Sequence, residues 1–314
     1  MKEDTELFYA VAVMYYKDGL NQQEIAARMN LSRPMVSRIL AKAQECGIVR
    51  ISVVKPEPIE SLSYRLEKEL GISKVYVAPT TNMMKNCSET RVGDISDYAS
   101  QILISELQDK KNIGVGWGST IYKTIMKMVE KSVTDFSSDH NIVPIVGSVG
   151  VREVQYQVNI IVSMLAHVLG GSVYFYNSAE ASKDGFREKY RDLFEIWKKL
   201  DAVLFGLGSA PFSSKMPYEA IQGEAPDYIE NVKGAVGDIL GQFFTNDAMI
   251  SSNWNVDYLS LSVEKLKKVG RRICLCGGTE KVDAIIAAAR LGLYNVLVTD
   301  ARTAEEIIKR KESE

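Results

Sequence analysis

The chain has 314 residues, of which 46% are hydrophobic and 25% charged, so it has the length and composition of two globular domains. Its formal net charge of −2 argues against a protein whose whole surface attracts nucleic acid. Residues 1–55 nevertheless hold eight Lys or Arg against six Asp or Glu, a local charge of +2 that leaves −4 for the remainder. Any contact with nucleic acid is therefore expected near the N-terminus.

The cysteines indicate neither a metal site nor a disulfide framework. There are four, without metal-ligand spacing, and the two histidines, His140 and His167, lie far from them in sequence. We expect reduced thiols, no metal and no cofactor. The chain opens without the charged and then apolar pattern of a leader, and no apolar run approaches the length of a membrane span. A cytoplasmic protein that contacts no membrane is expected.

A helix over residues 5–19 is predicted to open the N-terminal domain. Leu7, Ala10, Val11 and Met14 recur at intervals of three and four, which is typical of an amphipathic helix. This apolar face is expected to support the two helices that follow, giving a three-helix unit.

Residues 21–51 predict a helix-turn-helix. Asn21 is a good N-cap for a first helix, and Glu24 three residues later completes a capping box. Ile25 and Met29 lie four residues apart and so share one face of that helix. A turn of two residues then separates this helix from a second one.

The second helix is expected to begin at its N-cap, Ser32, and to end at Gly47. Pro34 fits in the first turn because the N–H groups there have no partner inside the helix. An apolar stripe should pack this helix on the first one, and it consists of Met35, Val36, Ile39, Leu40 and Ala43. Residues 48–54 have the β-branched composition of a short strand, which would give a winged or near-winged arrangement.

This layout suits DNA, because a helix in the major groove presents short and cationic side chains near its N-terminus to base edges and phosphates. The expected DNA contacts are Gln22, Gln23, Ser32, Arg33, Ser37, Arg38 and Lys42. The two arginines have guanine acceptors within their reach, whereas the glutamines would meet phosphate oxygens. The alternative is a plain helical hairpin with a solvated polar face. Two caps, a turn of suitable length and the placement of the cations favour DNA binding.

A short connector is predicted after the first domain. Pro56 and Pro58 prevent a strand from continuing and stiffen the chain. We place the DNA-binding domain at residues 1–55, the linker at 56–60 and a larger domain at 61–314. The larger domain opens with a helix over residues 61–70 that has a leucine at every fourth position.

From Lys74 onward, apolar runs of five to eight residues alternate with helical segments. Runs that are apolar at consecutive positions suit parallel strands covered on both faces. The sequence therefore predicts an α/β fold, a doubly wound and Rossmann-like domain. The helices are expected at 91–107, 120–131, 155–169, 185–199, 263–269, 281–291 and 303–309.

Several strands end in glycine next to a small hydroxyl residue. In an open parallel sheet, ligands bind beyond the carboxyl ends of the strands, where glycine admits a close backbone and helix N-termini attract anions. The expected effector-binding residues there are Gly116, Gly118, Ser119, Thr120, Gly147, Ser148, Gly208, Ser209, Gly277 and Gly278. For each glycine alone, a tight turn is the simpler explanation. Their recurrence at one sheet edge favours an anion site, although no dinucleotide fingerprint is present.

Two charged residues near these loops are further candidates. Lys281 follows the last glycine loop, where a cation can hold a phosphate, and Asp238 is a carboxylate able to accept sugar hydroxyls. Each alone is more often a solvated surface charge. Four other aspartates look like turn or cap residues: Asp227, Asp247, Asp257 and Asp300.

With these motifs in view, the chain resembles the SorC family of bacterial transcriptional regulators over essentially its whole length. The resemblance includes NQQEIAARMNLSRPMVSRILAKAQECGIV, GVGWGST, VPIVGS, DAVLFGLGS, GAVGDILGQFF and GGTEKVDAIIAAARLGLYNVLVTD. It implies a larger domain shaped like sugar-phosphate isomerases that serves as an effector sensor, in a homodimer or homotetramer on operator double-stranded DNA. It also implies that the GWGST loop with Gly147 and Ser148 holds a phosphate, and that Asp238 and Lys281 line the rest of the pocket.

Three functions are compatible with these residues. The first is a transcriptional regulator controlled by a phosphorylated sugar or related metabolite. The second is a sugar-phosphate isomerase, deaminase or lactonase with an added DNA-binding domain; Asp238 is its only candidate base. The third is a DNA-binding scaffold with a vestigial pocket, which leaves the clustered glycine loops without a use. We expect the regulator and not an enzyme.

Overall fold

The computed structural model describes residues 2–49, 58–79, 88–131, 139–148, 154–177, 184–209, 232–250 and 260–313. The chain divides into two compact units, Met1–Pro56 and Glu57–Glu314, which are described separately. Within the described ranges, no helix combines the length and the apolar character that crossing a bilayer requires. Cys87, Asp227, Asp257 and residues 50–54 of the predicted wing lie outside those ranges.

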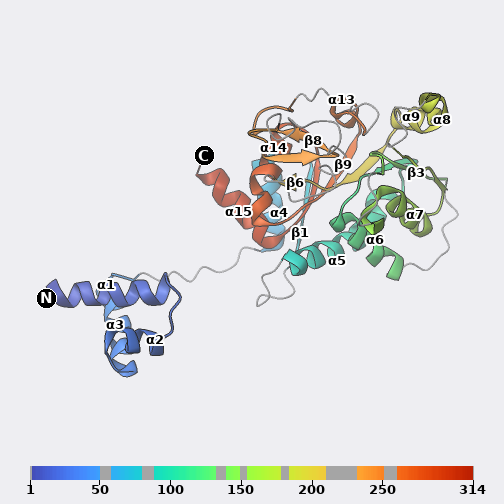
Figure 1. Ribbon diagram of the computed structural model, residues 1–314. Helices are drawn as coiled ribbons and strands as arrows, with labels where there is room; N and C mark the ends of the chain where they lie inside the picture. The colour runs from blue at the N-terminus through green and yellow to red at the C-terminus, as the bar shows by residue number, and fades with distance from the viewer. Residues whose placement is uncertain are drawn as a thin grey trace. The chain divides into compact units, whose positions relative to one another are not determined.

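The first unit is a three-helix arrangement of α1 (Lys2–Tyr16), α2 (Gln22–Met29) and α3 (Arg33–Glu45), drawn in blue in Figure 1. At the centre of its core lie Val11, Ile25 and Val36. Each comes from a different helix, and all three are fully buried. Met35, predicted to belong to the apolar stripe of α3, is 43% exposed, so that prediction is wrong. The apolar stripe of α3 therefore has four buried residues, because at 100° per residue Met35 lies on the flank of the stripe.

The predicted caps of this unit are confirmed. The Asn21 side chain accepts hydrogen bonds from the backbone N–H groups of Gln23 and Glu24 at 2.9 and 3.0 Å, and the Glu24 carboxylate accepts from the Asn21 N–H at 2.8 Å. Ser32 Oγ accepts from the Met35 N–H at 3.4 Å at the start of α3. These bonds satisfy donors that the first turn of a helix leaves without intrahelical partners, which fixes both helix starts.

The second unit is built on a seven-stranded parallel sheet with the order β1-β10-β9-β5-β2-β3-β4. The strands are β1 (Lys74–Ala78), β2 (Asn112–Val115), β3 (Asn141–Pro144), β4 (Ser172–Val173), β5 (Ala202–Phe205), β9 (Arg271–Leu275) and β10 (Val296–Asp300). β5 and β10 are buried at every position, as strands covered on both faces should be. The doubly wound α/β prediction is confirmed.

Helices cover the sheet in two groups (Figure 1). One group is α5 (Ser88–Leu107), α6 (Ser119–Lys131) and α7 (Val158–Leu169), which pack on one another in sequence. The other contains α4 (Ile59–Leu70), α14 (Val282–Arg290) and α15 (Ala301–Glu312), which also pack on one another. The shorter helices are α8 (Phe186–Lys189), α9 (Arg191–Trp197) and α13 (Val263–Leu266).

Some predicted helices differ from the observed ones at their ends. α4 begins at Ile59, inside the predicted linker, and ends at the left-handed Gly71. The predicted helix over 155–169 starts as a 3-10 turn, η1 (Val154–Tyr156), before α7, and the one over 281–291 follows η3 (Thr279–Lys281). The predicted helix over 185–199 is interrupted at Tyr190, where α8 gives way to α9.

A second sheet, which the sequence pattern does not predict, joins β6 (Gly208–Ser209), β7 (Gly237–Ile239) and β8 (Gln242–Phe244) as antiparallel strands. The β7–β8 hairpin turns through Leu240 and Gly241, at φ +53° and +79°. Two consecutive positive φ values are those of the tight hairpin turn whose twist matches the strands. Glycine adopts this conformation freely, whereas Leu240 is strained in it.

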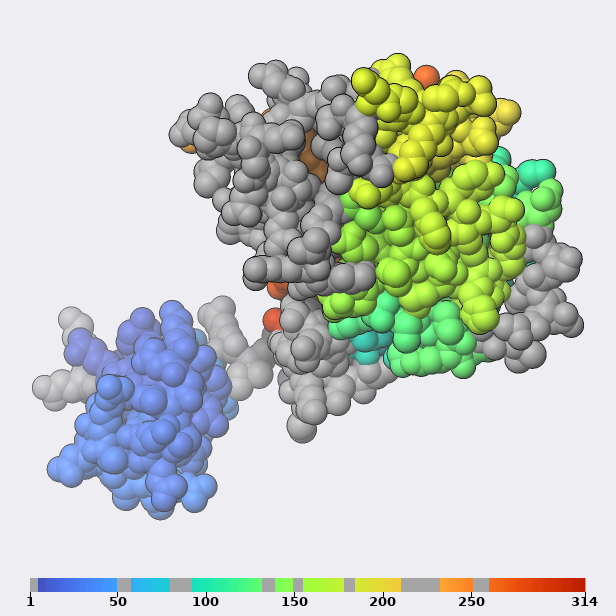
Figure 2. Space-filling view, turned by 45° about the vertical axis from the view of Figure 1, so that its right-hand side comes forward, coloured from blue at the N-terminus to red at the C-terminus, as the bar shows by residue number. Residues whose placement is uncertain are grey.

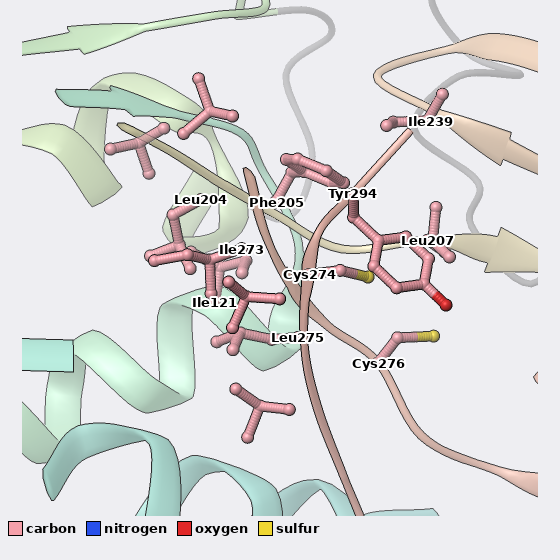
Figure 3. Packing of buried hydrophobic residues seen from close by; sticks show 14 of the residues in the cluster. Ile121, Leu204, Phe205, Leu207, Ile239, Ile273, Cys274, Leu275, Cys276 and Tyr294 are labelled. Atoms are coloured by element: carbon pink, nitrogen blue, oxygen red, sulfur yellow. The ribbon is translucent and has the colours of Figure 1, made fainter. Parts of the chain in front are cut away.

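The core between the layers is continuous and apolar. Figure 3 shows Leu204 and Phe205 from β5 beside Ile273, Cys274 and Leu275 from β9, all buried. Cys274 and the following Cys276 are free thiols at most 1% exposed, and Cys46 is also a free thiol. The expectation of unpaired cysteines therefore holds for these three, and Cys274 and Cys276 pack in the core.

Candidate functional site

The order of the strands places a topological switch point at the carboxyl ends of β2 and β5, and we call the region beyond these strand ends the crevice. From β2 the chain winds outward to β3 and β4, returns to β5 on the other side of β2, and then winds the opposite way to β9 and β10. Adjacent strands from which the chain leaves in opposite directions form a topological switch point, where open parallel sheets bind ligands. The loops leaving these two strands are Gly116–Gly118 and Gly206–Leu207.

The β2 loop leads directly into the N-terminus of α6. Gly116 N–H donates to Leu204 O at 2.8 Å, which ties the loop to β5. Gly118 has φ +128°, and no atom of the described residues lies within 4 Å of where its Cβ would be; Ser119, the first residue of α6, is exposed. The first N–H groups of a helix attract anions. The accessible part of this anion-binding geometry is therefore at Gly118 and Ser119, the end of the loop that enters α6.

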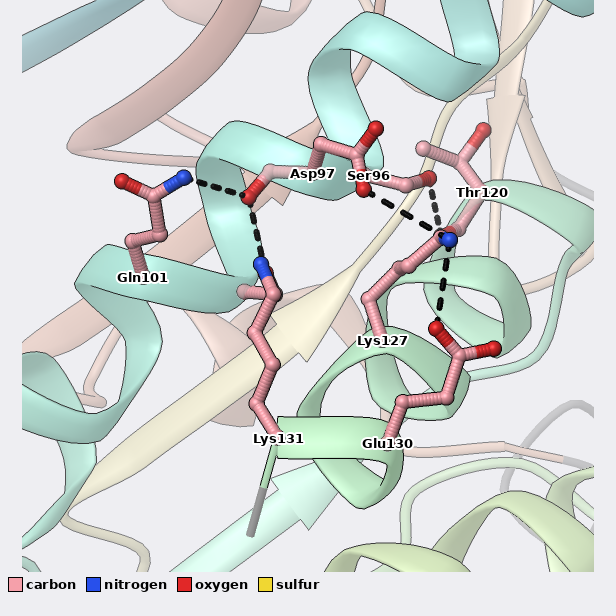
Figure 4. Close-up of polar contacts among 8 residues, drawn as sticks. Ser96, Asp97, Gln101, Thr120, Lys127, Glu130 and Lys131 are labelled. Carbon is pink, nitrogen blue, oxygen red and sulfur yellow. Dashed lines mark hydrogen bonds and ion pairs between the residues drawn. The ribbon is translucent and has the colours of Figure 1, made fainter.

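α5 holds this helix start in place through the polar contacts of Figure 4. Ser96 Oγ donates to Thr120 O at 3.5 Å, and the same carbonyl accepts from Thr124 Oγ1 at 2.8 Å. Toward the other end of α6, Lys131 Nζ donates to Ser100 Oγ at 2.9 Å, and Lys127 lies 3.8 Å from an Asp97 carboxylate oxygen. The β2 loop thus leads into a helix, α6, that is bonded to α5 near both of its ends.

Asp238 reaches the crevice from the second sheet. It pairs with Gly208 in the β6–β7 ladder, and a Cβ at position 208 would lie 1.8 Å from Asp238 Oδ1, so only glycine fits. Asp238 is 6% exposed, and burial raises the pKa of its carboxyl group to about 6. A backbone hydrogen bond from Gly241 and the charge of Lys281 oppose that rise. Asp238 is a buried acid and not the solvated surface charge of the simpler explanation.

Lys281 is anchored across the same crevice. Its Nζ donates to Leu207 O at 2.7 Å, which joins the start of α14 to the loop after β5. The ammonium group also lies close enough to Asp238 to lower the pKa of that carboxyl. The structure therefore brings together the β2 loop, the β5 loop, Asp238 and Lys281.

The glycine pair after β9 has a packing role. Gly278 N–H donates to Thr303 Oγ1 at 2.7 Å, and a Cβ on Gly277 would lie 2.4 Å from Asp300 Oδ2. Asp300 in turn accepts hydrogen bonds from the N–H and hydroxyl of Thr303 at 2.9 and 2.6 Å, as the N-cap of α15. The predicted cap role of Asp300 is confirmed. The contacts of Gly277 and Gly278 favour the tight-turn explanation for these two glycines.

Gly147 and Ser148 follow β3, next to the β2 loop. Ser148 N–H donates to Tyr176 O at 3.1 Å, and Gly147 is buried. Tyr176 is itself held by Asn159, whose side chain bonds the Tyr176 N–H and carbonyl at 3.0 and 3.1 Å. Burial among aromatic rings raises the pKa of the Tyr176 hydroxyl. On this side of the crevice, the backbone N–H of Ser148 is therefore already bonded within the protein and does not face a ligand.

Leu240, which the sequence pattern did not indicate, packs against the β2 loop. It is 4% exposed, and its Cδ2 would lie 2.9 Å from a Cβ on Gly116. A strained residue that covers a glycine loop is typical of ligand clamps. The available signal was the segment GDILGQFF, in which a polar and glycine-containing turn separates two short apolar runs.

The proposed DNA contacts lie on the outer face of the first unit. Arg33, Ser37 and Arg38 are exposed on α3. Lys42 is also exposed and forms an ion pair with Glu45 at 2.7 Å, a hydrogen bond that raises the pKa of the Lys42 ammonium. Exposed Met35 lies on the same flank as Arg38 and Lys42, since i, i+3 and i+7 share one side of a helix. Its apolar side chain suits a thymine methyl group.

The start of α2 offers fewer backbone donors than the sequence suggests. The capping box already satisfies the N–H groups of Gln23 and Glu24. A phosphate at this position would therefore meet the side-chain amides of Gln22 and exposed Gln23.

Comparison with known proteins covers both units. The family described as "Putative sugar-binding domain" matches residues 55–309, and "Sigma-70, region 4" matches residues 10–46. The deoxyribonucleoside regulator of Bacillus subtilis is 26% identical over 98% of both chains. The sorbitol operon regulator of Klebsiella pneumoniae is 24% identical over 98% of this chain and 99% of that one. The transcriptional regulator LsrR of an Enterobacter species is 29% identical over 97% and 93%, respectively.

Solved structures show the same fold. The full-length sorbitol operon regulator SorC of Klebsiella pneumoniae superposes with a TM-score of 0.70 at 23% identity, covering 96% of this chain and 98% of that one. A DeoR family regulator of Listeria monocytogenes gives 0.67 at 25% identity over 79% of this chain and 99% of its own. The chain therefore belongs to the SorC family of DNA-binding transcriptional regulators, in which a helix-turn-helix unit is joined to a sugar-binding domain.

Proposed function

We propose that a phosphorylated sugar binds in the crevice beyond β2 and β5 and thereby controls how tightly this regulator holds operator DNA. The observation that supports this most is that the same crevice has a helix start that attracts anions and a carboxylate that can accept hydroxyl groups. An anion-attracting helix start lies at Ser119, and a buried carboxylate, Asp238, with a neighbouring cation, Lys281, lies opposite. A sugar phosphate has a group suited to each.

In this proposal the phosphate lies against Gly116, Gly118, Ser119 and Thr120 at the start of α6. Gly147 and Ser148 close the side formed by β3, and Gly208 and Ser209 form the floor. The Asp238 carboxylate accepts sugar hydroxyls, because at pH 7 a group with a pKa of about 6 is mostly ionised. Lys281 would exchange the Leu207 carbonyl for a ligand oxygen. The packing of Gly277 and Gly278 gives them the smallest share in binding.

Control of DNA requires that the crevice and the reading units share an assembly. Reading heads related by a two-fold axis bind half-sites about 34–36 Å apart, so a small rotation changes the fit. A coupling of about 1–3 kcal/mol between the ligands changes operator affinity about 5–150-fold. A homodimer or homotetramer that acts on the chromosome in the cytoplasm meets this requirement.

An enzyme is the second candidate, and one observation favours it: a carboxyl group with a pKa of about 6 is poised to act as a general base. His140 is no candidate for this role, because it lies at the amino ends of the strands, away from the crevice. It precedes β3 and its Nδ1 contacts Lys110 O at 2.7 Å. Since the relatives are named as regulators, we propose binding without catalysis. Turnover of a sugar phosphate that Asp238→Asn abolishes would reverse this conclusion.

A thermal-shift screen of the full chain against matched pairs of sugar phosphates and free sugars tests the ligand class. At a ligand concentration of 100 times Kd, binding adds about 2.7 kcal/mol to the free energy of unfolding. We expect a phosphorylated sugar to raise the Tm and its unphosphorylated partner to have little effect. If only free sugars raise the Tm, the phosphate assignment of the α6 start is wrong.

A further inference from the structure

Two charged groups of the crevice are already engaged with other parts of the chain. Lys281 Nζ donates a hydrogen bond to Leu207 O at 2.7 Å. The Asp238 carboxyl group accepts a hydrogen bond from the N–H of Gly241, in the turn between β7 and β8. A ligand that uses either group must therefore compete with a contact that the protein makes with itself.

The glycine loop after β2 is covered in the same way, by Leu240 from the neighbouring position of that turn. Leu240 is 4% exposed, Gly116 is buried, and Leu240 Cδ2 would lie 2.9 Å from a Cβ on Gly116. A phosphate beside Gly116 would need the space that the leucine side chain fills, because protein interiors are close-packed. A clamp closes over its ligand, whereas Leu240 contacts the loop itself and leaves no room between them.

The backbone of Leu240 is strained in this position. Its φ of +53° lies in the left-handed region, which is unfavourable for a residue with a Cβ. Asparagine or glycine is the usual residue at this place in a two-residue hairpin turn. The strain is offset by the burial of the leucine side chain, a contribution of similar size and opposite sign. The covered and uncovered arrangements of the turn are therefore close in free energy.

The base of the β7–β8 hairpin is fixed, whereas its tip is linked to the crevice. At the base, Gln242 Nε2 donates to Leu261 O at 2.9 Å, and Ile239 is fully buried. At the tip, no described atom lies within 4 Å of where a Cβ of Gly241 would be. A sugar hydroxyl that donates to Asp238 shares this carboxylate with the Gly241 N–H. Ligand binding at Asp238 and the position of the tip are therefore coupled.

We propose that the hairpin tip, Leu240 and Gly241, is an autoinhibitory plug that fills the phosphate position beside Gly116 until a sugar phosphate displaces it. Displacement moves the leucine side chain off the β2 loop and releases its strained backbone, while Asp238 exchanges the Gly241 N–H for a sugar hydroxyl. The inference rests on the proposed function and adds regulation to the same site. The plug sets the ligand concentration needed for a response, because the apparent Kd is the intrinsic Kd divided by the fraction of open crevice.

Removal of the plug should tighten the binding of inorganic phosphate to the full chain, measured by titration calorimetry. With the open arrangement populated at about 10% or less, Leu240→Ala should raise the apparent affinity about tenfold or more. Leu240→Gly should have the same effect and secures folding, since glycine adopts the turn conformation freely. Leu266→Ala is the control for the loss of a fully buried leucine, because α13 leads into the amino end of β9. It should bind phosphate as the native chain does.

Hydrogen exchange at the Gly241 N–H provides the second arm. In the native chain, saturating phosphate should speed this exchange, because the tip then leaves Asp238. In Leu240→Gly the exchange should already be fast without phosphate. Slower exchange on addition of phosphate would overturn the plug and show that the tip closes over its ligand.

The affinities also separate a failure of the plug from a failure of the phosphate site. If the native chain binds phosphate and both Leu240 variants bind it equally or more weakly, the plug is wrong and the proposed function stands. If neither the native chain nor the variants bind phosphate, the anion site of the proposed function is refuted, and the plug with it.

Discussion

The proposed DNA-reading face of α3 and the crevice beyond β2 and β5 are built in different ways. On α3 the side chains are exposed, and each is placed by its position along one capped helix. In the crevice the groups come from separate strands, and Asp238 and Leu240 are buried against glycines with no room to spare. Figure 2 shows the outer surface of the first unit, whose atoms are coloured blue.

This difference has a consequence for mutation. Changes on an exposed helix face should alter binding and leave folding intact, since the side chains have few partners to lose. Changes in the crevice should alter folding as well, because each group there is held by close packing.

The largest effect is expected for Gly208→Ala. A Cβ at this position would lie 1.8 Å from Asp238 Oδ1, so the β6–β7 ladder or the carboxylate must move. We expect a loss of about 3 kcal/mol in the free energy of unfolding, measured by urea denaturation of the full chain. Gly93→Ala in α5 is the control, because no described residue lies within 4 Å of its Cβ. Equal stability of the two variants would contradict the packing of Asp238 on Gly208.

The next effect is a pH dependence due to Asp238. Its pKa is about 6 in the folded chain, above the ordinary value of 3.8, so the folded state binds the proton more tightly than the unfolded state. Stability contributed by this group is therefore lost as pH rises through the window from about 4 to 6, by roughly 2–3 kcal/mol. Asp238→Asn should remove this dependence in denaturation experiments at pH 5 and pH 7.5. An unchanged pH dependence in the variant would show that the carboxyl group titrates normally.

Arg38→Ala should weaken operator binding by about 1–3 kcal/mol without changing the Tm. The reason is that Arg38 is exposed and its proposed partner is a guanine. Arg302→Ala, at an exposed position on α15, serves as the control for the loss of one cation. Met35→Ala sharpens the test, since a loss confined to sites with thymine would show that this side chain contacts DNA. A drop in the Tm of Arg38→Ala would mean that the residue supports the fold.

The smallest effect is expected at the cap of α2. Asn21→Ala removes an acceptor for two N–H groups at 2.9 and 3.0 Å and should cost about 1 kcal/mol of stability. The change is measurable as a shift of the denaturation midpoint of the first unit. Lys17→Ala, another exposed position of that unit, is a suitable control. Without any shift, the capping box would be a feature of geometry that contributes nothing to stability.

Local signals in the sequence predicted the first unit and the main sheet well. The caps at Asn21 and Ser32 act within three residues, so their chemistry is visible in the sequence itself. The exposure of Met35 was not predicted, because spacing alone does not tell the edge of an apolar stripe from its flank. Most strands of the parallel sheet lie within consecutive apolar residues, which a sequence pattern detects without knowledge of the tertiary structure.

The crevice was predicted less completely. Glycine loops at strand ends indicated the correct edge of the sheet, but not which loops pack and which remain open. Gly277 and Gly118 are alike in the sequence, yet only Gly277 faces a neighbouring carboxylate. The small β6–β7–β8 sheet escaped detection because its strands have two or three residues and pair across distant parts of the chain. Asp238 is buried because β7 pairs with the distant β6, and no local sequence pattern predicts that pairing.

The central claim is that occupation of the crevice changes the affinity of the reading units for DNA. The most direct test is the operator Kd of the full chain at fixed salt, with and without a saturating concentration of the sugar phosphate that raises its Tm. We predict a change of about 5–150-fold, lost in Asp238→Asn. An identical Kd in the presence and absence of a ligand that demonstrably binds would contradict the account.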